Sequence, residues 1–168
     1  MSEANFKTLI SKFGEAVGIK ELETDQDNYC CLGFGDKIIV HVQYEENTQS
    51  LILFSPLGIV NHGYEKIIFP KLLQSNALWK DTAGATISLD DDTNEVILAI
   101  QFPTQSLEFT QFQEILETFI KTSEHFIDSI ESVLSGNPWP EITYHKLEKD
   151  NKPKKGEEPP SFPGAIRA

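Results

Sequence analysis

The sequence has few of the features that mark oxidised, secreted or membrane-spanning proteins. Its two cysteines, Cys30 and Cys31, are adjacent, so a disulfide between them would be strained, and we expect reduced thiols in a cytosolic protein. The longest apolar runs, Leu51–Phe54 and Val96–Ile100, are far shorter than the ~20 residues that cross a bilayer. Residues 1–10 lack the continuous apolar segment of a secretory signal.

Basic residues are scarce relative to acidic ones. The 168 residues include 14 lysines and arginines against 26 aspartates and glutamates, which gives a net charge of −12. Binding to nucleic acid or to anionic lipid requires a basic face, so we expect no nucleic-acid partner and no membrane insertion. Residues 141–168 hold six basic and five acidic residues, so the acidic excess lies wholly in residues 1–140.

Motifs for catalysis, cofactors and metals are incomplete. Gly33-Phe34-Gly35 resembles the start of a phosphate-binding loop, but a strand follows where a helix is needed, so a hairpin turn is the better interpretation. Residues 90–94 imitate a calcium loop, but Glu95 and Gln101 replace its required glycine and glutamate. The histidines have no partner at zinc-ligand spacing, and a lone strand histidine such as His41 is more often a packing residue than a general base. We expect no enzymatic activity, no cofactor and no metal.

Hydrophobic periodicity predicts one domain over residues 1–140. Apolar residues at three- and four-residue spacing indicate helices, and short apolar or alternating runs indicate strands. The predicted order is α-β-β-β-α-β-β-α, and the short links between strands favour a twisted, mostly antiparallel five-stranded sheet in an α+β fold. The predicted helices cover residues 2–18, 64–79 and 108–134, and the predicted strands cover 29–34, 37–44, 50–54, 84–89 and 95–102, with a loop at 55–63.

Two segments have an unusual composition. Residues 141–168 are rich in proline, lysine and glutamate and contain few large apolar residues, which predicts a flexible C-terminal tail outside the sheet. Residues 64–79 are apolar on almost every side, and Pro70 either opens this helix or kinks it. A short helix that is apolar all round must be buried, and an oligomer interface is one place to bury it.

A pattern within residues 72–98 resembles a known family. It consists of Leu72-Leu73-Gln74-Ser75-Asn76, then Gly84-Ala85-Thr86-Ile87-Ser88-Leu89-Asp90, and then Glu95-Val96-Ile97-Leu98. The class I chaperones of bacterial type III secretion, the Tir-chaperone family, carry a Leu-Leu-x-x-Asn helix end, a Gly-Ala-x-Leu-x-Leu strand, an acidic turn and another apolar strand. Ile87 replaces the first leucine of that strand. The tail lies outside the family pattern, although some multiple-cargo members carry such extensions.

The resemblance implies a cytoplasmic bacterial homodimer without enzymatic activity. Such a chaperone binds N-terminal segments of secreted effectors in extended form and delivers them for export, and an export ATPase or a second chaperone is a further candidate partner. By position, the resemblance implies a dimer interface of Leu72, Leu73, Asn76, Leu78, Trp79, Ala85 and Ile87. It also places the cargo groove on the first helix and the early strands, with candidates Phe6, Leu9, Ile10, Phe13, Leu32, Phe34, Ile39 and Leu53.

Three alternatives stay open at this point. The apolar stripe of the first helix is by default that helix's own core face. A structural adaptor of the secretion machine would share the fold and the dimer without carrying cargo. A small ligand-binding or enzymatic α+β domain would place Trp79, Trp139 and His41 around a pocket.

Overall fold

The computed structural model describes residues 3–105, 107–140 and 165–167. Over the first 140 residues the predicted order of helices and strands is confirmed, with one additional short 3₁₀ turn, η1. The elements are α1 (Glu3–Val17), β1 (Tyr29–Phe34), β2 (Ile38–Glu45), β3 (Ser50–Ile59), α2 (Glu65–Asn76), η1 (Ala77–Trp79), β4 (Thr86–Leu89), β5 (Glu95–Pro103), α3 (Phe109–Leu134) and β6 (Ala165–Arg167).

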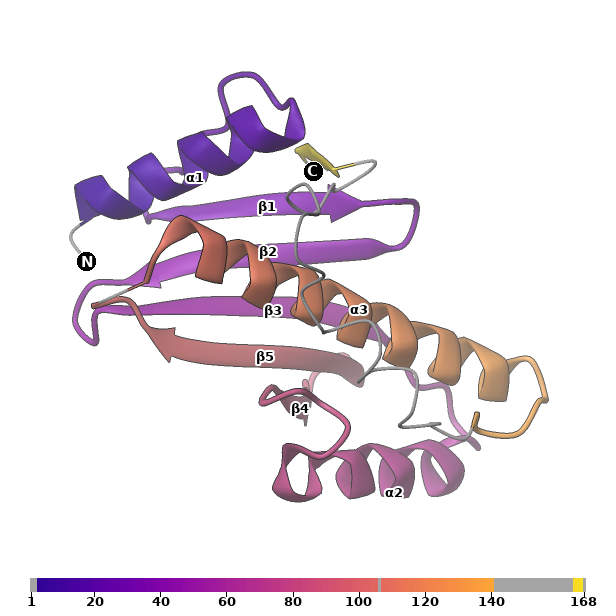
Figure 1. Cartoon of the computed structure of the whole chain (residues 1–168). Helices are drawn as coiled ribbons and strands as arrows, with labels where there is room; N and C mark the ends of the chain where they lie inside the picture. Colours follow the sequence, from indigo (N-terminus) through magenta and orange to yellow (C-terminus); the bar gives the residue numbers. More distant parts are fainter. Residues whose placement is uncertain (1–2, 106, 141–164, 168) are drawn as a thin grey trace, which may run out of the picture.

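The strands form one antiparallel sheet in the order β4-β5-β3-β2-β1-β6 (Figure 1). The pairing of Val42 with Leu53, and of Leu53 with Ile100, aligns apolar side chains across the three central strands. Because side chains alternate between the two faces of a strand, this register gathers the large apolar residues on one face. The predicted α+β fold with an antiparallel sheet is therefore confirmed.

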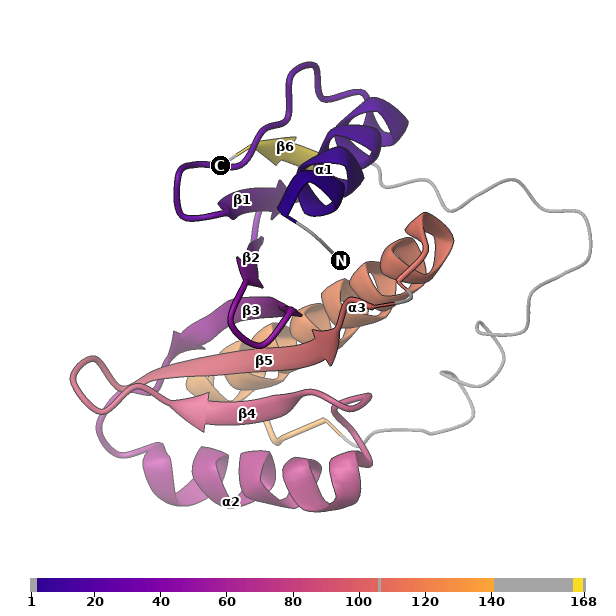
Figure 2. The same ribbon diagram turned by 90° about the vertical axis from the view of Figure 1, so that its left-hand side faces the viewer.

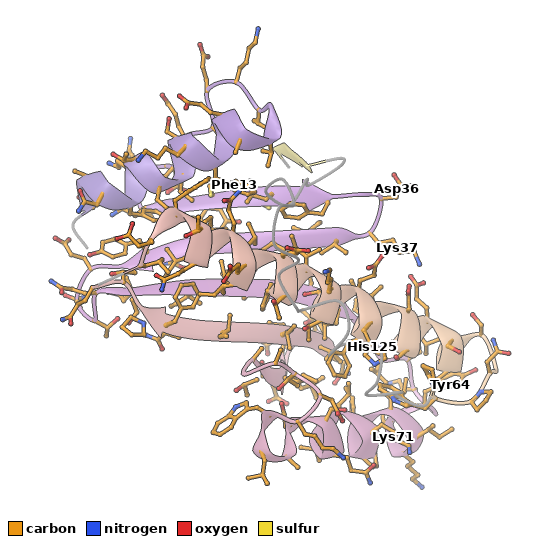
Figure 3. All side chains as sticks on the ribbon, viewed as in Figure 1. Phe13, Asp36, Lys37, Tyr64, Lys71 and His125 are labelled. Atoms are coloured by element: carbon orange, nitrogen blue, oxygen red, sulfur yellow. The ribbon has the colours of Figure 1, made fainter. Side chains whose placement is uncertain are left out.

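Helices α1 and α3 cover this apolar face, and α2 lies beside β4 at the far end of the sheet (Figures 1 and 2). Phe13 of α1 meets Phe112 of α3 edge to face, with ring centroids 5.8 Å apart, and Phe6 stacks on Tyr44 of β2 at 5.4 Å. Figure 3 shows Phe13 directed from α1 toward the sheet. These aromatic contacts join both helices to one continuous core, which includes the central strands.

Two predicted boundaries differ from the structure. The predicted loop over residues 55–63 is wrong in its first half, because β3 continues to Ile59. A register shift between Pro56 and Gly58 lets the strand continue to pair with β5, and Gly58 adopts a φ of 124° there. The second predicted helix ends at Asn76 and passes into η1, while Pro70 lies inside α2 without ending it.

The C-terminus contributes a sixth strand. Residues 165–167 pair with β1, so the expectation that the whole tail lies outside the sheet is wrong for these three residues. A strand of three residues is too short to produce a detectable hydrophobic period, which is why the sequence does not reveal it. The rest of the predicted flexible tail lies outside the described residues.

The β1–β2 hairpin is also held against α3. Lys37 in the hairpin turn forms ion pairs with Glu131 at 2.6 Å and with Asp128 at 3.3 Å, and Figure 3 shows Lys37 at this end of the sheet. All three side chains are about half exposed, so the pairs position the hairpin more than they stabilise it.

Candidate interaction surfaces

The first candidate site is an apolar surface at the α2 end of the molecule, which we call the α2–β4 surface. A hollow of about 220 Å³ lies between the last turns of α2 and β4. Two large side chains of η1, Leu78 and Trp79, follow directly in the chain and are exposed. The hollow is lined by Phe69, Leu72, Leu73, Asn76, Ile87, Ser88, Leu89 and Val96.

Three residues predicted to form a dimer interface are exposed apolar side chains. Leu73 is 70% exposed, Leu78 is 91% exposed and Trp79 is 57% exposed. Large apolar side chains in contiguous exposed patches mark sites of protein contact. The other apolar residues of the predicted interface are buried within the protomer: Leu72, Ala85 and Ile87. Leu72 and Ile87 line the hollow, whereas Ala85 lines a separate hollow beside α3.

The backbone of η1 is strained where these side chains are displayed. Leu78 and Trp79 adopt φ values of 58° and 52°, in the left-handed region that bulky residues rarely occupy. Such conformations cost on the order of 1–3 kcal/mol each and cluster at functional sites. Because neither side chain is buried within the protomer, core packing gives no reason for the strain.

Asn76, the remaining residue of the predicted interface, has a role within the protomer. Its Nδ2 donates a hydrogen bond to the carbonyl oxygen of Ile87 at 2.9 Å, and its Oδ1 accepts one from the Ile87 N–H at 2.8 Å. The side-chain amide thus takes the place of a neighbouring strand at the outer edge of β4. The asparagine that ends the Leu-Leu-x-x-Asn pattern therefore satisfies both outward backbone groups of Ile87 at one edge of the sheet.

The residues predicted to line the cargo groove are mostly core residues in the described chain. Ile39 alone among them is exposed, at 39%. The default interpretation of the α1 stripe, as the helix's own core face, therefore describes the free protomer, and contact of these residues with cargo stays a prediction. The buried members are Phe6, Leu9, Ile10, Phe13, Leu32, Phe34 and Leu53.

An aromatic cluster on the face of the sheet opposite α1 and α3 was not predicted from the sequence. His41 stacks on Phe54 of β3 at 4.4 Å, and the hydroxyl of Tyr29 hydrogen-bonds to its Nδ1. Burial lowers the pKa of His41 and so favours the neutral ring, while the nearby Glu95 carboxylate opposes this shift. The alternation of Ile39 and His41 along β2 indicated this face, but the stacking partners come from other strands.

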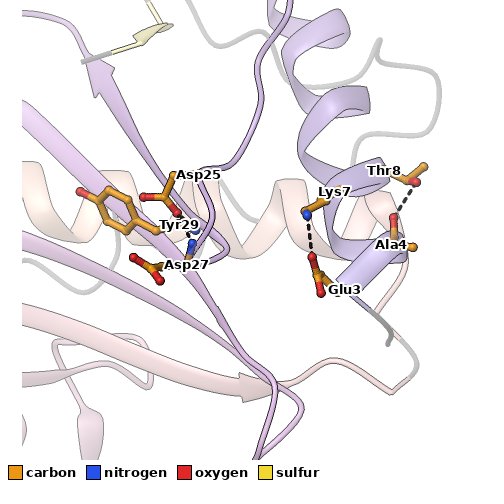
Figure 4. Close-up of polar contacts among 7 residues, drawn as sticks. All are labelled: Glu3, Ala4, Lys7, Thr8, Asp25, Asp27 and Tyr29. Atoms are coloured by element: carbon orange, nitrogen blue, oxygen red, sulfur yellow. Dashed lines mark hydrogen bonds and ion pairs between the residues drawn. The ribbon is translucent and has the colours of Figure 1, made fainter.

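The outer edge of β1 is the second candidate site. Asp25, in the loop before β1, accepts hydrogen bonds through Oδ1 from the N–H groups of Asp27 and Tyr29, at 2.9 and 3.0 Å (Figure 4). Its own N–H donates to the carbonyl of Tyr29 at 2.9 Å. The loop thus satisfies the outward backbone groups of Tyr29, and β6 pairs with the other half of the strand, Leu32–Phe34.

Within the described ranges we find no metal site and no membrane span. No group of three or more histidine, cysteine, aspartate or glutamate side chains there is arranged to hold a metal ion. In the same part of the chain, no helix combines the length and the apolar character that a bilayer span requires.

Comparison with solved structures identifies the fold. The chain resembles a protein in the crystal structure of the ExsC–ExsE complex, with a TM-score of 0.66 and 19% identity over 76% of this chain and 95% of that one. It also resembles a chain in the Yersinia pestis structure of the type III secretion chaperone SycH with a YscM2 fragment (TM-score 0.57, 18% identity, 72% and 98% covered). YbjN, a putative transcription regulator from E. coli, shares the fold at 10% identity (TM-score 0.55, 83% and 97% covered).

These structural similarities establish the fold alone, since all three identities are low. No curated protein sequence matches the chain significantly. The model of the Tir chaperone protein (CesT) family, however, matches residues 8–126. That range runs from α1 to the last third of α3 and includes the α2–β4 surface and the five strands before α3. This chain belongs to the Tir chaperone protein (CesT) family.

Proposed function

We propose that this protein is a non-enzymatic chaperone in the bacterial cytoplasm that binds N-terminal segments of type III secretion effectors in extended form and delivers them for export. The observation that carries the proposal is the match of residues 8–126 to a chaperone family. Structures of the same fold include a type III secretion chaperone bound to a fragment of another protein, which supports the same function here.

The α2–β4 surface is the proposed homodimer interface. In an isologous interface both protomers use the same surface. The exposed side chains of Leu73, Leu78 and Trp79 from the two protomers would therefore bring six apolar side chains into one interface. Leu72 and Ile87, which line the hollow, would support them, and Asn76 would hold β4 in place. Ala85 stays a predicted member of the interface. The strained backbone of η1 supports this proposal, because it displays two apolar side chains that a second copy of the chain would cover.

An extended cargo segment is expected to bind through its backbone and through a few apolar side chains. Backbone pairing at a sheet edge tolerates many sequences, while contacts to alternate side chains give selectivity. Ile39, exposed on β2 beside the β1 edge, is the predicted cargo residue that is accessible without rearrangement of the core. Ordering a disordered segment costs free energy, so we expect modest affinity for each segment.

The test is recovery of the full chain from its native cytosol after brief cross-linking, followed by reconstitution with each recovered protein's N-terminal segment. We expect one segment per two copies of this chain in native mass spectrometry. Recovery of fixed secretion components alone would replace the proposal with a structural adaptor. A bound small molecule with no protein partner would replace it with a ligand-binding domain.

A further inference from the structure

The two edges of the sheet are closed in different ways. At β4, the edge is closed by Asn76, which lies eleven residues from Ile87 and is anchored in α2. At β1, the first half is closed by the Asp25 loop, four residues from Tyr29. The second half, Leu32–Phe34, is closed by residues from the opposite end of the chain. Figures 1 and 2 both show β6 alongside β1, on the side away from β2.

The direction of the β1 backbone groups identifies which residue β6 covers. Tyr29 turns its N–H and carbonyl to Asp25, away from β2, whereas the carbonyl of Asn28 accepts from Tyr44 of β2. Backbone groups alternate along a strand, so Gly33 also turns its N–H and carbonyl outward. Gly33 is the residue that pairs with Ile166. The N–H of Ile166 therefore faces the outward carbonyl of Gly33.

Strand β1 lacks the usual protection of an edge strand. Its sequence, Tyr-Cys-Cys-Leu-Gly-Phe, contains no lysine, no proline and no charge. An apolar edge of this kind readily pairs with any extended segment unless it is covered. Residues 141–164, which connect Pro140 to β6, reach at most roughly 80 Å when extended, so the tail has ample length to cover the edge or to leave it.

We propose that β6 is a displaceable placeholder: the C-terminus of this chain occupies the β1 edge until an extended cargo segment replaces it. This proposal rests on the proposed function for the identity of the incoming segment, but occupation of the edge itself does not. A tethered strand held through few backbone bonds acts at an effective concentration of roughly millimolar, so it protects the edge and still yields to a longer strand. The apparent affinity for cargo is the intrinsic affinity multiplied by the fraction of time that the edge is free.

Amide hydrogen exchange of the full-length chain by NMR tests the occupied edge without any cargo. Ile166→Pro removes the N–H that faces Gly33, and Ile166→Val is the matched control that keeps it. We expect the Gly33 amide to exchange about tenfold faster in Ile166→Pro, as for a strand docked roughly nine-tenths of the time. The Leu32 amide, which points to β2, is the internal reference and should not change. Equal Gly33 rates in all three proteins would overturn the proposal.

A second measurement tests displacement. The probe is a synthetic peptide with the sequence of residues 161–168, titrated into each full-length protein while the Gly33 amide signal is followed. We expect the peptide to bind Ile166→Pro about tenfold more tightly than it binds the wild type or Ile166→Val. In the latter two proteins β6 still covers the β1 edge and competes with the peptide. Equal affinity for all three would overturn the proposal. Since both readouts use only this chain and its own peptide, their failure would leave the cargo proposal intact, and failure to find effector cargo would leave the placeholder intact.

Discussion

Replacing Leu73 by aspartate should abolish dimerisation while leaving the protomer folded. The side chain is 70% exposed in the protomer, so its loss removes little core packing. Full burial of a leucine contributes about 1.5–3 kcal/mol, so covering the remaining surface contributes about 1–2 kcal/mol per protomer. Because the residue occurs twice in an isologous interface, Leu73→Ala should weaken the dimer by about 2–4 kcal/mol, or roughly 30- to 700-fold in Kd. Leu73→Asp adds the desolvation of two charges.

Sedimentation velocity over a dilution series from micromolar to nanomolar concentration would measure this effect. We expect the wild type to sediment as a dimer of twice 18.9 kDa and Leu73→Asp as a monomer with an unchanged circular dichroism spectrum. Ile39→Asp is the matched control, because Ile39 is also an exposed apolar residue but lies on β2, away from the α2–β4 surface. A Leu73→Asp protein that dimerises with the wild-type Kd would refute the interface.

Three further predictions concern the protomer, measured at fixed protein concentration. Asn76→Ala should lower the free energy of unfolding in urea by about 1–3 kcal/mol, because two β4 backbone groups lose their partner; an unchanged value would contradict the edge-closing role. Gly14→Ala should destabilise despite a helix-propensity gain of about 1 kcal/mol, since its Cβ would lie 2.5 Å from Leu22 Cβ; a higher unfolding midpoint would show that α1 tolerates the methyl group. Burial lowers the pKa of His41 and His125 in the folded chain. As the pH drops, these histidines therefore become protonated in the unfolded chain first, and Tm should fall from about pH 6.5 down through their folded-state pKa values. The double variant with glutamine at both positions should show a weaker pH dependence, and an equal dependence would exclude these histidines as its source.

The helices and strands were predictable where one face is buried. The 26-residue helix α3 matches its predicted range closely because its apolar residues recur at a helical spacing, and the first strand does so because the Gly35-Asp36 turn marks its end. The continuation of β3 past Pro56 was not predictable, since proline and glycine normally mark a loop. Only the pairing partner β5 shows that a local irregularity absorbs them.

The candidate sites were predictable in part. The resemblance pointed to Leu73, Leu78 and Trp79, and the structure leaves these side chains exposed. Sequence periodicity alone cannot distinguish a helix stripe that packs on its own sheet from one that faces a partner, which is why α1 supplied cargo candidates that are core residues. The Leu-Leu-x-x-Asn pattern contains Asn76, but its hydrogen bonds to Ile87 appear only once α2 and β4 pack together. The pairing of Ile166 with Gly33 joins opposite ends of the chain, and no local pattern encodes it.

The most direct test of the proposed chaperone function is native mass spectrometry of the purified full-length chain, alone and with the N-terminal segment of an effector recovered with it. We expect a dimer for the chain alone and a complex of two chains with one segment after mixing, whereas Leu73→Asp should give neither species. A monomeric wild type that binds no effector segment would contradict the proposed function.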